Sequence, residues 1–149
     1  MEYFRIEKGI TFYKSLTRKN EEKKLAGTAY CFLAAIVVFA VFDFNIAITS
    51  LMFMWLGDGL ANIYGTYVGK IRLKNGKSFE GTVTGFIVNV LVANIILGFN
   101  WHLILPMAFT ASVVELFSTS RLNDNLTVPL ASGFVGQVIV ITLGCVGCL

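Results

Sequence analysis

Long apolar stretches alternate with short polar segments along the chain. Five such stretches run approximately over residues 25–42, 46–68, 82–99, 102–118 and 126–149. A bilayer core of about 30 Å needs about 20 helical residues, with about 17 as the practical minimum. Backbone polar groups find no water in lipid, so stretches of this length are expected to be helical. The pattern predicts an all-α polytopic membrane bundle with about five transmembrane helices, of which the first and fourth are short.

The first 24 residues follow a different pattern. Apolar residues recur there near helical spacing, with basic residues between them. This is typical of an amphipathic helix that lies on a membrane surface. We therefore expect two parts: a basic interfacial segment over residues 1–24 and a single transmembrane domain over residues 25–149.

Composition agrees with a membrane protein. The chain is 56% hydrophobic and only 14% charged, and its mean hydropathy is +0.73. A net charge of +3 without a basic face on a soluble fold argues against nucleic acid as a partner. The one C-x-x-C pair, Cys145 and Cys148, has neither a second pair nor a nearby His, so it does not form a zinc site.

Basic residues mark one side of the predicted bundle. Seven lie in residues 1–24, four in the link between the second and third stretches, and Arg121 in the link between the fourth and fifth. The other two links carry none. Because five spans alternate in direction, all the basic segments fall on one side, which the positive-inside rule makes cytoplasmic. The N-terminus is then expected inside and the C-terminus outside.

An acidic residue, Asp58, lies inside the second apolar stretch. A charge at membrane depth is costly and usually marks a functional site. On a helix, Asp58 shares one face with Asn62 and Thr66. Small residues that permit close helix packing form the neighbouring stripe: Gly57, Ala61, Gly65 and Gly69. The glycines on either side of Asp58 indicate a locally opened helix, which would suit a ligand site.

Further acidic and amide side chains lie towards the predicted cytoplasmic side. Glu80 precedes the third stretch, Glu115 lies near the end of the fourth, and Asp124 and Asn125 precede the fifth. Either of the last two is a candidate cap for the fifth helix. Together with Asp58 and Glu80 they are candidates to hold a divalent cation, because carboxylate and amide oxygens suit Mg²⁺.

The segment LKNGKSFEG at residues 73–81 contains Gly-Lys-Ser, the end of a P-loop motif. The motif requires a first glycine at position 71, which is Ile71, and a strand before the loop, where a membrane helix is predicted. We therefore reject a P-loop. The loop still suits phosphate, because the N-terminus of the next helix offers free amides. Charge and close backbone approach come from Lys70, Arg72, Lys74 and Lys77 and from Gly69, Gly76 and Gly81.

The polar motifs occur in an order that resembles a known family. They are NEEKKLAGTAYCFLA at 20–34, LGDGLANIYGTYVGK at 56–70, GKSFEGTVTGF at 76–86 and VELFSTSRLNDNLTVPL at 114–130. The set resembles the CTP-dependent lipid kinases, which include dolichol kinase, phytol kinase and the CTP-type diacylglycerol kinases. That family is distantly similar to phosphatidate cytidylyltransferase. The resemblance covers most of residues 20–130.

The resemblance implies nucleotide-dependent transfer at the cytoplasmic face. The implied active-site residues are Asp58, Lys77, Glu80, Glu115, Asp124 and Asn125. The Pro-x-His-Gly-Gly pattern of the cytidylyltransferases is absent, which favours a kinase. Larger members of the family carry further helices and an Arg-Lys…His segment before the part seen here. Three interpretations of the chain are therefore open: a short natural form, a truncated gene product or an incomplete core of the family.

The expected reaction is phosphoryl transfer from CTP to a lipid alcohol such as a polyprenol, phytol or diacylglycerol. Asp58 and Asp124, with Asn125 or Glu115, are expected to hold Mg²⁺. Phosphate binding is expected from Lys77 with Lys70 or Arg72, beside Gly76, and pocket walls from Asn62, Gly57, Gly65 and Gly81. Glu80 or Asp58 is expected to accept the proton of the alcohol.

Other interpretations remain open. They are cytidylyl transfer to a lipid phosphate, a catalytically inactive membrane homologue and, less favoured, a transporter. A homo-oligomer that completes the site is a further expectation for so few spans.

Overall fold

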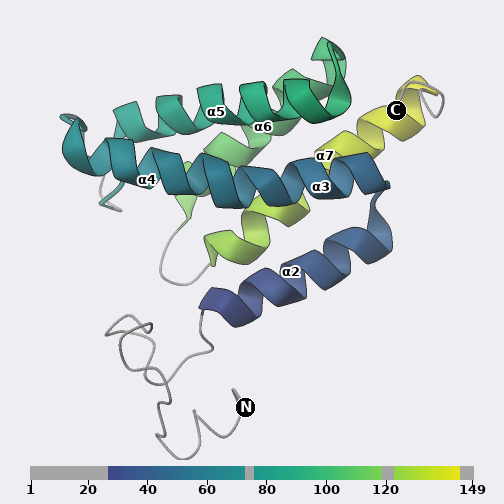
Figure 1. The fold of residues 1–149 in the computed structure, drawn as a ribbon, viewed down its shortest axis with the longest axis horizontal. Coiled ribbons are helices and arrows are strands. Elements are labelled where there is room, and N and C mark those ends of the chain that lie inside the picture. Colours follow the sequence, from purple (N-terminus) through teal and green to yellow (C-terminus); the bar gives the residue numbers. More distant parts are fainter. Residues whose placement is uncertain (1–26, 73–75, 119–122, 145–149) are drawn as a thin grey trace, which may run out of the picture.

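Each regular element of the computed structural model is helical within residues 27–72, 76–118 and 123–144, the residues that the structure describes. The elements are α2 (Gly27–Val41), α3 (Phe44–Met52), a π-helical segment (Phe53–Gly57), α4 (Asp58–Tyr67), α5 (Phe79–Leu97), α6 (Trp101–Phe117) and α7 (Asp124–Leu143). The second, third and fourth of these form one rod (Figure 1). The predicted all-α membrane bundle is confirmed.

Three helices are long and apolar enough to cross a membrane: Phe44–Tyr67, Phe79–Leu97 and Asp124–Leu143. The other two, α2 with 15 residues and α6 with 17, are apolar but shorter. At 1.5 Å per residue, α2 is only about 23 Å long, less than a bilayer core. The prediction of five spans is therefore supported by length for three of them. The predicted amphipathic helix over residues 1–24 and the pair Cys145 and Cys148 lie outside the described residues.

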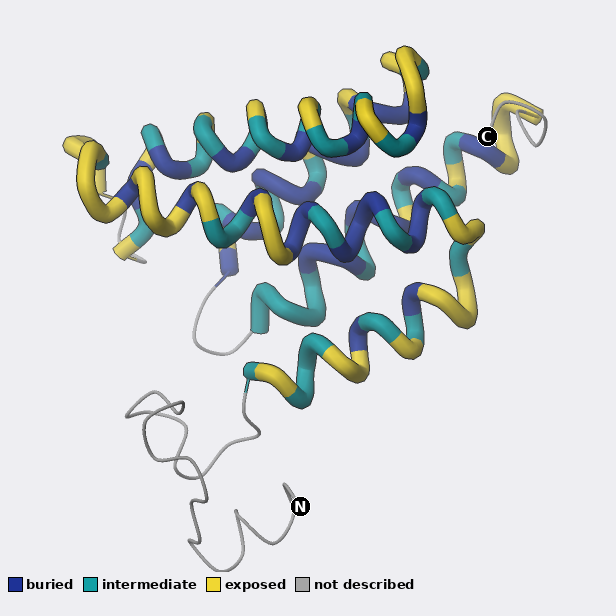
Figure 2. Tube along the Cα trace, in the orientation of Figure 1, coloured by how far each residue is buried: buried dark blue, intermediate teal, exposed yellow. Residues whose placement is uncertain are grey.

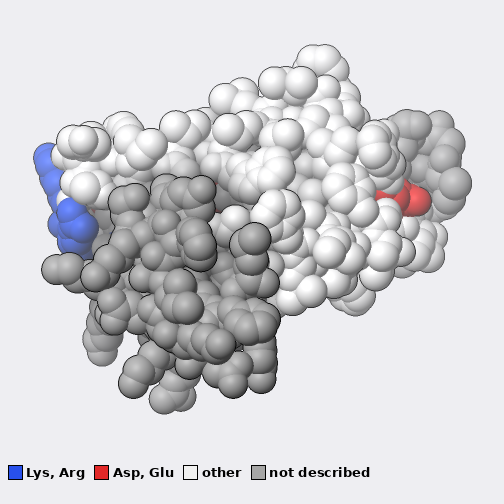
Figure 3. Space-filling view, turned by 60° about the horizontal axis from the view of Figure 1, so that its bottom comes forward, with Lys and Arg blue, Asp and Glu red and all other residues white. Residues whose placement is uncertain are grey.

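The helices run up and down. The start of α2 and the links α4–α5 and α6–α7 lie at one end, while the links α2–α3 and α5–α6 and the end of α7 lie at the other (Figure 1). Exposed Lys70 and Arg72 lie in the α4–α5 link, and exposed Asp43 in the α2–α3 link. Figure 3 accordingly shows basic side chains at one end and acidic ones at the other. Which end faces the cytoplasm stays a prediction.

The buried core lies where α3, α5, α6 and α7 meet. Its largest members include Ile46, Phe53, Leu103, Ile104 and Met107. Many apolar side chains on the outer helix faces stay exposed, for example Phe32 at 68% and Ile95 at 82% (Figure 2). Such faces are unfavourable in water but suit contact with lipid tails.

Helices α4 and α5 approach each other through small residues. A Cβ at Gly81 would lie 2.6 Å from Ala61 O and 3.1 Å from Gly65 Cα, and one at Gly85 would lie 3.0 Å from Ala61 Cβ. The backbones pack this closely only because those side chains are absent. The predicted packing stripe on α4 is thus confirmed, and its partner is the stripe Gly81–Gly85–Asn89 of α5.

Candidate active site

Lys77, in the loop before α5, lies where three carboxylates converge. Its Nζ is 3.7 Å from Asp58 Oδ1, 3.5 Å from Glu115 Oε1 and 3.5 Å from Asp124 Oδ2. Asp58 is the first residue of α4, Glu115 lies near the end of α6, and Asp124 is the first residue of α7. Packing of the helix ends therefore assembles one ionic cluster from residues that are far apart in sequence. We call these four residues the Lys77 cluster.

Asp58 enters the cluster directly after the π-helical segment. The backbone N–H of Asp58 donates to Phe53 O, the longer hydrogen-bond step of a π turn. Asn62 Nδ2 donates to Asp58 Oδ1 at 2.8 Å, and Thr66 Oγ1 donates to Asn62 O at 2.7 Å. The expected opening of the helix next to Asp58 is thus present, as a wider turn. Such turns are frequent at functional sites.

Glu115 and Asp124 reach the cluster from opposite sides of the α6–α7 link. The Glu115 side chain is only 4% exposed, whereas that of Asp124 is 30% exposed. Asp124 is the first residue of α7, where a carboxylate interacts favourably with the helix dipole. The N-cap is Asn123, which makes no side-chain cap bond, so the prediction that Asp124 or Asn125 caps this helix is wrong.

The cluster has more negative than positive charge. With all four groups ionised, three carboxylates face one ammonium. Lys77 Nζ is buried and makes no hydrogen bond to any described residue, because its acidic neighbours lie beyond good hydrogen-bond geometry. A deficit of positive charge is costly at low dielectric. The oxygen-only set of acids suits a hard cation such as Mg²⁺ in its chemistry.

The metal prediction itself is not tested by this geometry. No three His, Cys, Asp or Glu side chains of the described residues stand close enough together to hold a metal ion. Lys77 instead occupies the centre at which Asp58, Glu115 and Asp124 point. These acids stay the predicted metal ligands, and their use by a metal requires the ammonium group to move.

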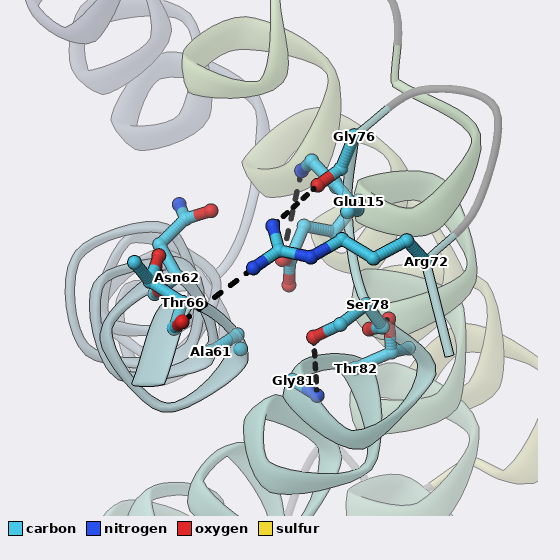
Figure 4. Close-up of a pocket in the computed structure, with 11 residues that line it drawn as sticks. Ala61, Asn62, Thr66, Arg72, Gly76, Ser78, Gly81, Thr82 and Glu115 are labelled. Atoms are coloured by element: carbon cyan, nitrogen blue, oxygen red, sulfur yellow. Dashed lines mark hydrogen bonds and ion pairs between the residues drawn. The ribbon is translucent and has the colours of Figure 1, made fainter. Parts of the chain in front are cut away.

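A small pocket adjoins the cluster between α4 and the start of α5. Arg72 crosses it, with Nη1 donating to Gly76 O and Nη2 to Thr66 O, both at 3.5 Å (Figure 4). The volume of the pocket is about 30 Å³, room for about one water and too small for a nucleotide. The lining residues are Ala61, Asn62, Gly65, Thr66, Arg72, Gly76, Lys77, Ser78, Gly81, Thr82 and Glu115.

Most of the predicted phosphate-binding residues meet at this pocket. Arg72, Gly76 and Lys77 line it, and Gly76 has a φ of +80°, a conformation that favours glycine. Lys70 is exposed and does not line it. The predicted wall residues Asn62, Gly65 and Gly81 also line the pocket, whereas Gly57 does not.

The helix α5 begins at the pocket with a capped first turn. Ser78 is its N-cap, and Ser78 Oγ accepts a hydrogen bond from Gly81 N at 3.1 Å. This serine was part of the rejected P-loop match, and its capping role follows the ordinary preference for Ser at that position. One amide that a bound anion was expected to use is therefore already satisfied.

Two predicted site residues make contacts outside the cluster. Both carboxylate oxygens of Glu80 accept from Ile71 N, at 3.1 and 3.3 Å, which ties the loop to α5. Asn125 Nδ2 donates to Gly27 O at 3.3 Å, which ties α7 to α2. Neither residue lines the pocket. Their catalytic and nucleotide-binding roles stay predictions, and each has a structural contact in the folded chain.

Two buried polar residues that were not predicted as site residues lie beneath the cluster. Asn89 of α5 is 1% exposed and Ser112 of α6 is 4% exposed. Asn89 Nδ2 donates to Ser112 Oγ over a long distance of 3.5 Å. A signal was present, because Asn89 continues the four-residue spacing of Gly81 and Gly85 inside an apolar stretch. An uncharged amide in an apolar stretch is a weaker signal of a site than a carboxylate, because its burial costs less.

Several known proteins are similar to this chain. An uncharacterised protein of Rickettsia prowazekii is 30% identical over 137 residues, covering 85% of this chain and 67% of that protein. A probable chloroplast phytol kinase of Triticum aestivum is 33% identical over 152 aligned positions, covering 85% of this chain and 51% of the relative. Phytol kinase 1 of Arabidopsis thaliana is 32% identical over 138 residues, covering 80% and 45%.

No protein-family model and no solved structure matches the chain. The chain spans about half the length of the phytol kinases that it matches. The chain belongs to the family that includes these phytol kinases and the Rickettsia prowazekii protein.

Proposed function

We propose that the chain is a membrane lipid kinase that transfers a phosphoryl group from CTP to a lipid alcohol. The observation that carries the proposal is the Lys77 cluster, which lies at the polar end of the membrane bundle, the end with the α4–α5 and α6–α7 links. Relatives that bear the name phytol kinase support the reaction class. They also favour a long isoprenoid alcohol over other lipids as the acceptor.

Two cationic side chains would bind the triphosphate. Phosphoryl transfer needs mainly positioning and neutralisation of charge. The Arg72 guanidinium lies across the pocket on two long backbone contacts, which a phosphate can replace. Lys77 lines the same pocket, and its ammonium group lies among the three acids. Movement of the loop that carries both side chains would open the site for the nucleotide.

The acids of the cluster would hold Mg²⁺. Asp58 and Asp124, with Glu115, supply carboxylate oxygens of the type that this cation prefers. Bound Mg²⁺ would neutralise the negative charge of the triphosphate. The chain's own part is to hold these acids on three different helices, so that α4, α6 and α7 must stay packed for the site to exist.

Asp58 is the better placed of the two predicted proton acceptors. It lies in the cluster, whereas the Glu80 carboxylate is engaged with Ile71 N. The lipid oxygen would attack the terminal phosphorus of CTP, its proton would pass to Asp58, and CDP would leave. The exposed apolar faces of the helices suit lateral entry of the lipid, with only its hydroxyl reaching the polar end. That end is cytoplasmic by the charge rule.

The test uses the purified chain in lipid nanodiscs with radiolabelled nucleotide and Mg²⁺. Acceptors are phytol, a longer polyprenol and diacylglycerol, and donors are CTP and ATP in parallel. We expect a labelled lipid phosphate and CDP from CTP, lost in D58N. The matched control is D43N, because Asp43 lies at the opposite end and pairs with Gln137.

The products separate the proposal from its rivals. Release of pyrophosphate with phosphatidate as acceptor would indicate cytidylyl transfer instead. Absence of phosphorylated lipid with every donor and acceptor would contradict the kinase proposal for this chain, provided that the protein remains folded in the nanodisc.

A further inference from the structure

Asn89 is a buried amide in the middle of α5 whose oxygen has no hydrogen-bond partner among the described residues. Its one hydrogen bond among the described residues is the long one of 3.5 Å from Nδ2 to Ser112 Oγ. An unpaired amide oxygen in an apolar interior is unfavourable. The bundle would be at least as stable with an apolar side chain of the same shape, so stability alone gives no account of an amide here.

The carboxamide of Asn89 fills the space of a missing side chain. A Cβ at Gly57 would clash with Asn89 Oδ1 and lie 2.8 Å from its Cγ and 3.0 Å from its Nδ2. Gly57 is the last residue of the π-helical segment, and the next residue is Asp58. The carboxamide of Asn89 thus lies against the backbone at the point where the wide turn ends.

The same stripe of α5 continues from Asn89 to the cluster. One turn closer, a Cβ at Gly85 would lie 3.3 Å from Gly57 O and 3.4 Å from Glu115 Oε2. The backbone before Asp58 therefore packs against the Asn89 carboxamide and against Gly85, which lie on the same stripe of α5.

We propose that Asn89 is a positioning residue that fixes the π-helical turn and thereby the place of Asp58 beside Lys77. Asn89 touches neither phosphate nor alcohol and acts only through the backbone at Gly57. The activity part of this inference rests on the lipid kinase proposal. The geometric part concerns the pairing of Asp58 with Lys77 and is measurable without nucleotide or lipid acceptor.

The first test compares N89L with N94L. Leucine branches at the same atom as asparagine, but its two methyl groups are larger than the amide oxygen and nitrogen, so it cannot keep the close contact with Gly57. Asn94 is the matched control, because its Oδ1 is also buried without a hydrogen-bond partner among the described residues, while no Gly57 contact involves it. Both variants are expected to melt cooperatively near the wild-type temperature, which verifies folding.

The readout is acylation of Lys77 by an amine-reactive ester, measured by mass spectrometry with exposed Lys70 as the internal reference. Loss of one partly buried ion pair should raise Lys77 labelling about fivefold in N89L, and similarly in D58N. N94L should label like the wild type. In the kinase assay N89L should lower kcat and leave KM for CTP nearly unchanged.

The second test asks whether Gly57 and Asn89 act as a pair. G57A should raise Lys77 labelling because its methyl group displaces the carboxamide. The double variant G57A/N89A should return labelling towards the wild-type level, because it removes the obstructing group. Wild-type labelling in N89L, or a double variant that labels more than G57A, would overturn the inference. The two proposals can fail separately. If neither the wild type nor any variant phosphorylates lipid, but Lys77 labelling follows the expected order, the kinase proposal fails and the positioning role of Asn89 stands.

Discussion

Glu115 Oε1 lies 3.5 Å from Lys77 Nζ, although α5 and most of α6 separate the two residues along the chain. In the sequence Glu115 had no nearby basic partner. In the fold it is the least exposed acid of the Lys77 cluster. The pair shows that the ammonium group, which was expected to bind phosphate, lies among the acids and serves as their counter-ion.

Removal of the Lys77 charge should therefore destabilise the protein and strengthen its response to Mg²⁺. Without the ammonium, three carboxylates repel one another. Loss of a buried partner costs about 3–5 kcal/mol, and partial exposure of the acids reduces this to about 2 kcal/mol. K77M should melt lower than the wild type in EDTA, and Mg²⁺ should raise the Tm of K77M more than that of the wild type.

The measurement is tryptophan fluorescence during heating in detergent, with K70M as the control for loss of an exposed lysine. An equal effect of Mg²⁺ on K77M and the wild type would show that the cation does not take the place of the ammonium.

Substitution of the two predicted bases should have unequal effects. D58N removes an acid of the cluster, and we expect kcat to fall by about 100-fold or more, the range for loss of an electrostatic group in an active site. E80Q keeps an oxygen that accepts from Ile71 N, so kcat should change little. Both rates are measured with saturating CTP and lipid alcohol. A larger fall in kcat for E80Q than for D58N would indicate that Glu80, and not Asp58, accepts the proton.

The charge and shape of Arg72 should control the affinity for nucleotide. R72K keeps the charge and loses the planar fork that fits phosphate in two places. We expect KM for CTP to rise about tenfold in R72K, the effect of losing one good charge-assisted bond, while kcat changes less. R72M should raise KM further. Saturation curves for CTP at fixed Mg²⁺ test this, and an unchanged KM in both variants would remove Arg72 from the nucleotide site.

Close packing of α4 on α5 should be sensitive to one methyl group. In G81A the new Cβ would lie 2.6 Å from Ala61 O, a backbone atom that cannot rotate away. Such overpacking costs about 1–3 kcal/mol, so the Tm should fall. G59A is the matched control, because nothing lies within 4 Å of its Cβ and alanine favours the helix. A Tm of G81A equal to that of G59A would mean that the helices separate without cost.

The bundle was predictable because lipid leaves the backbone few choices. Apolar stretches of sufficient length become helices, and short links between them place neighbours antiparallel. The packing stripe of α4 was predictable for a similar reason, since only small residues at four-residue spacing permit such an approach. The prediction that the first and fourth helices are short agrees with α2 and α6, which have 15 and 17 residues.

The candidate site was predictable in its residue types and less so in its contacts. Asp58, Glu115 and Asp124 stood out because charge is rare among apolar spans. Glu80 stood out equally, yet its carboxylate turns to Ile71 N, and Asn125 turns to Gly27 O. Spacing along one helix says which residues share a face. It carries no information on the rotation of that helix relative to its neighbours.

Local pattern was therefore enough to identify the membrane bundle, the polar end and the acids worth testing, because each depends on one helix and its solvent. The meeting of Lys77 with acids from three helices depended on how those helices pack. So did the support of Asp58 by Asn89, because a π turn and a buried amide become partners only when α5 lies against Gly57. Long-range packing sets these distances, and it is specified by the whole bundle rather than by any one segment.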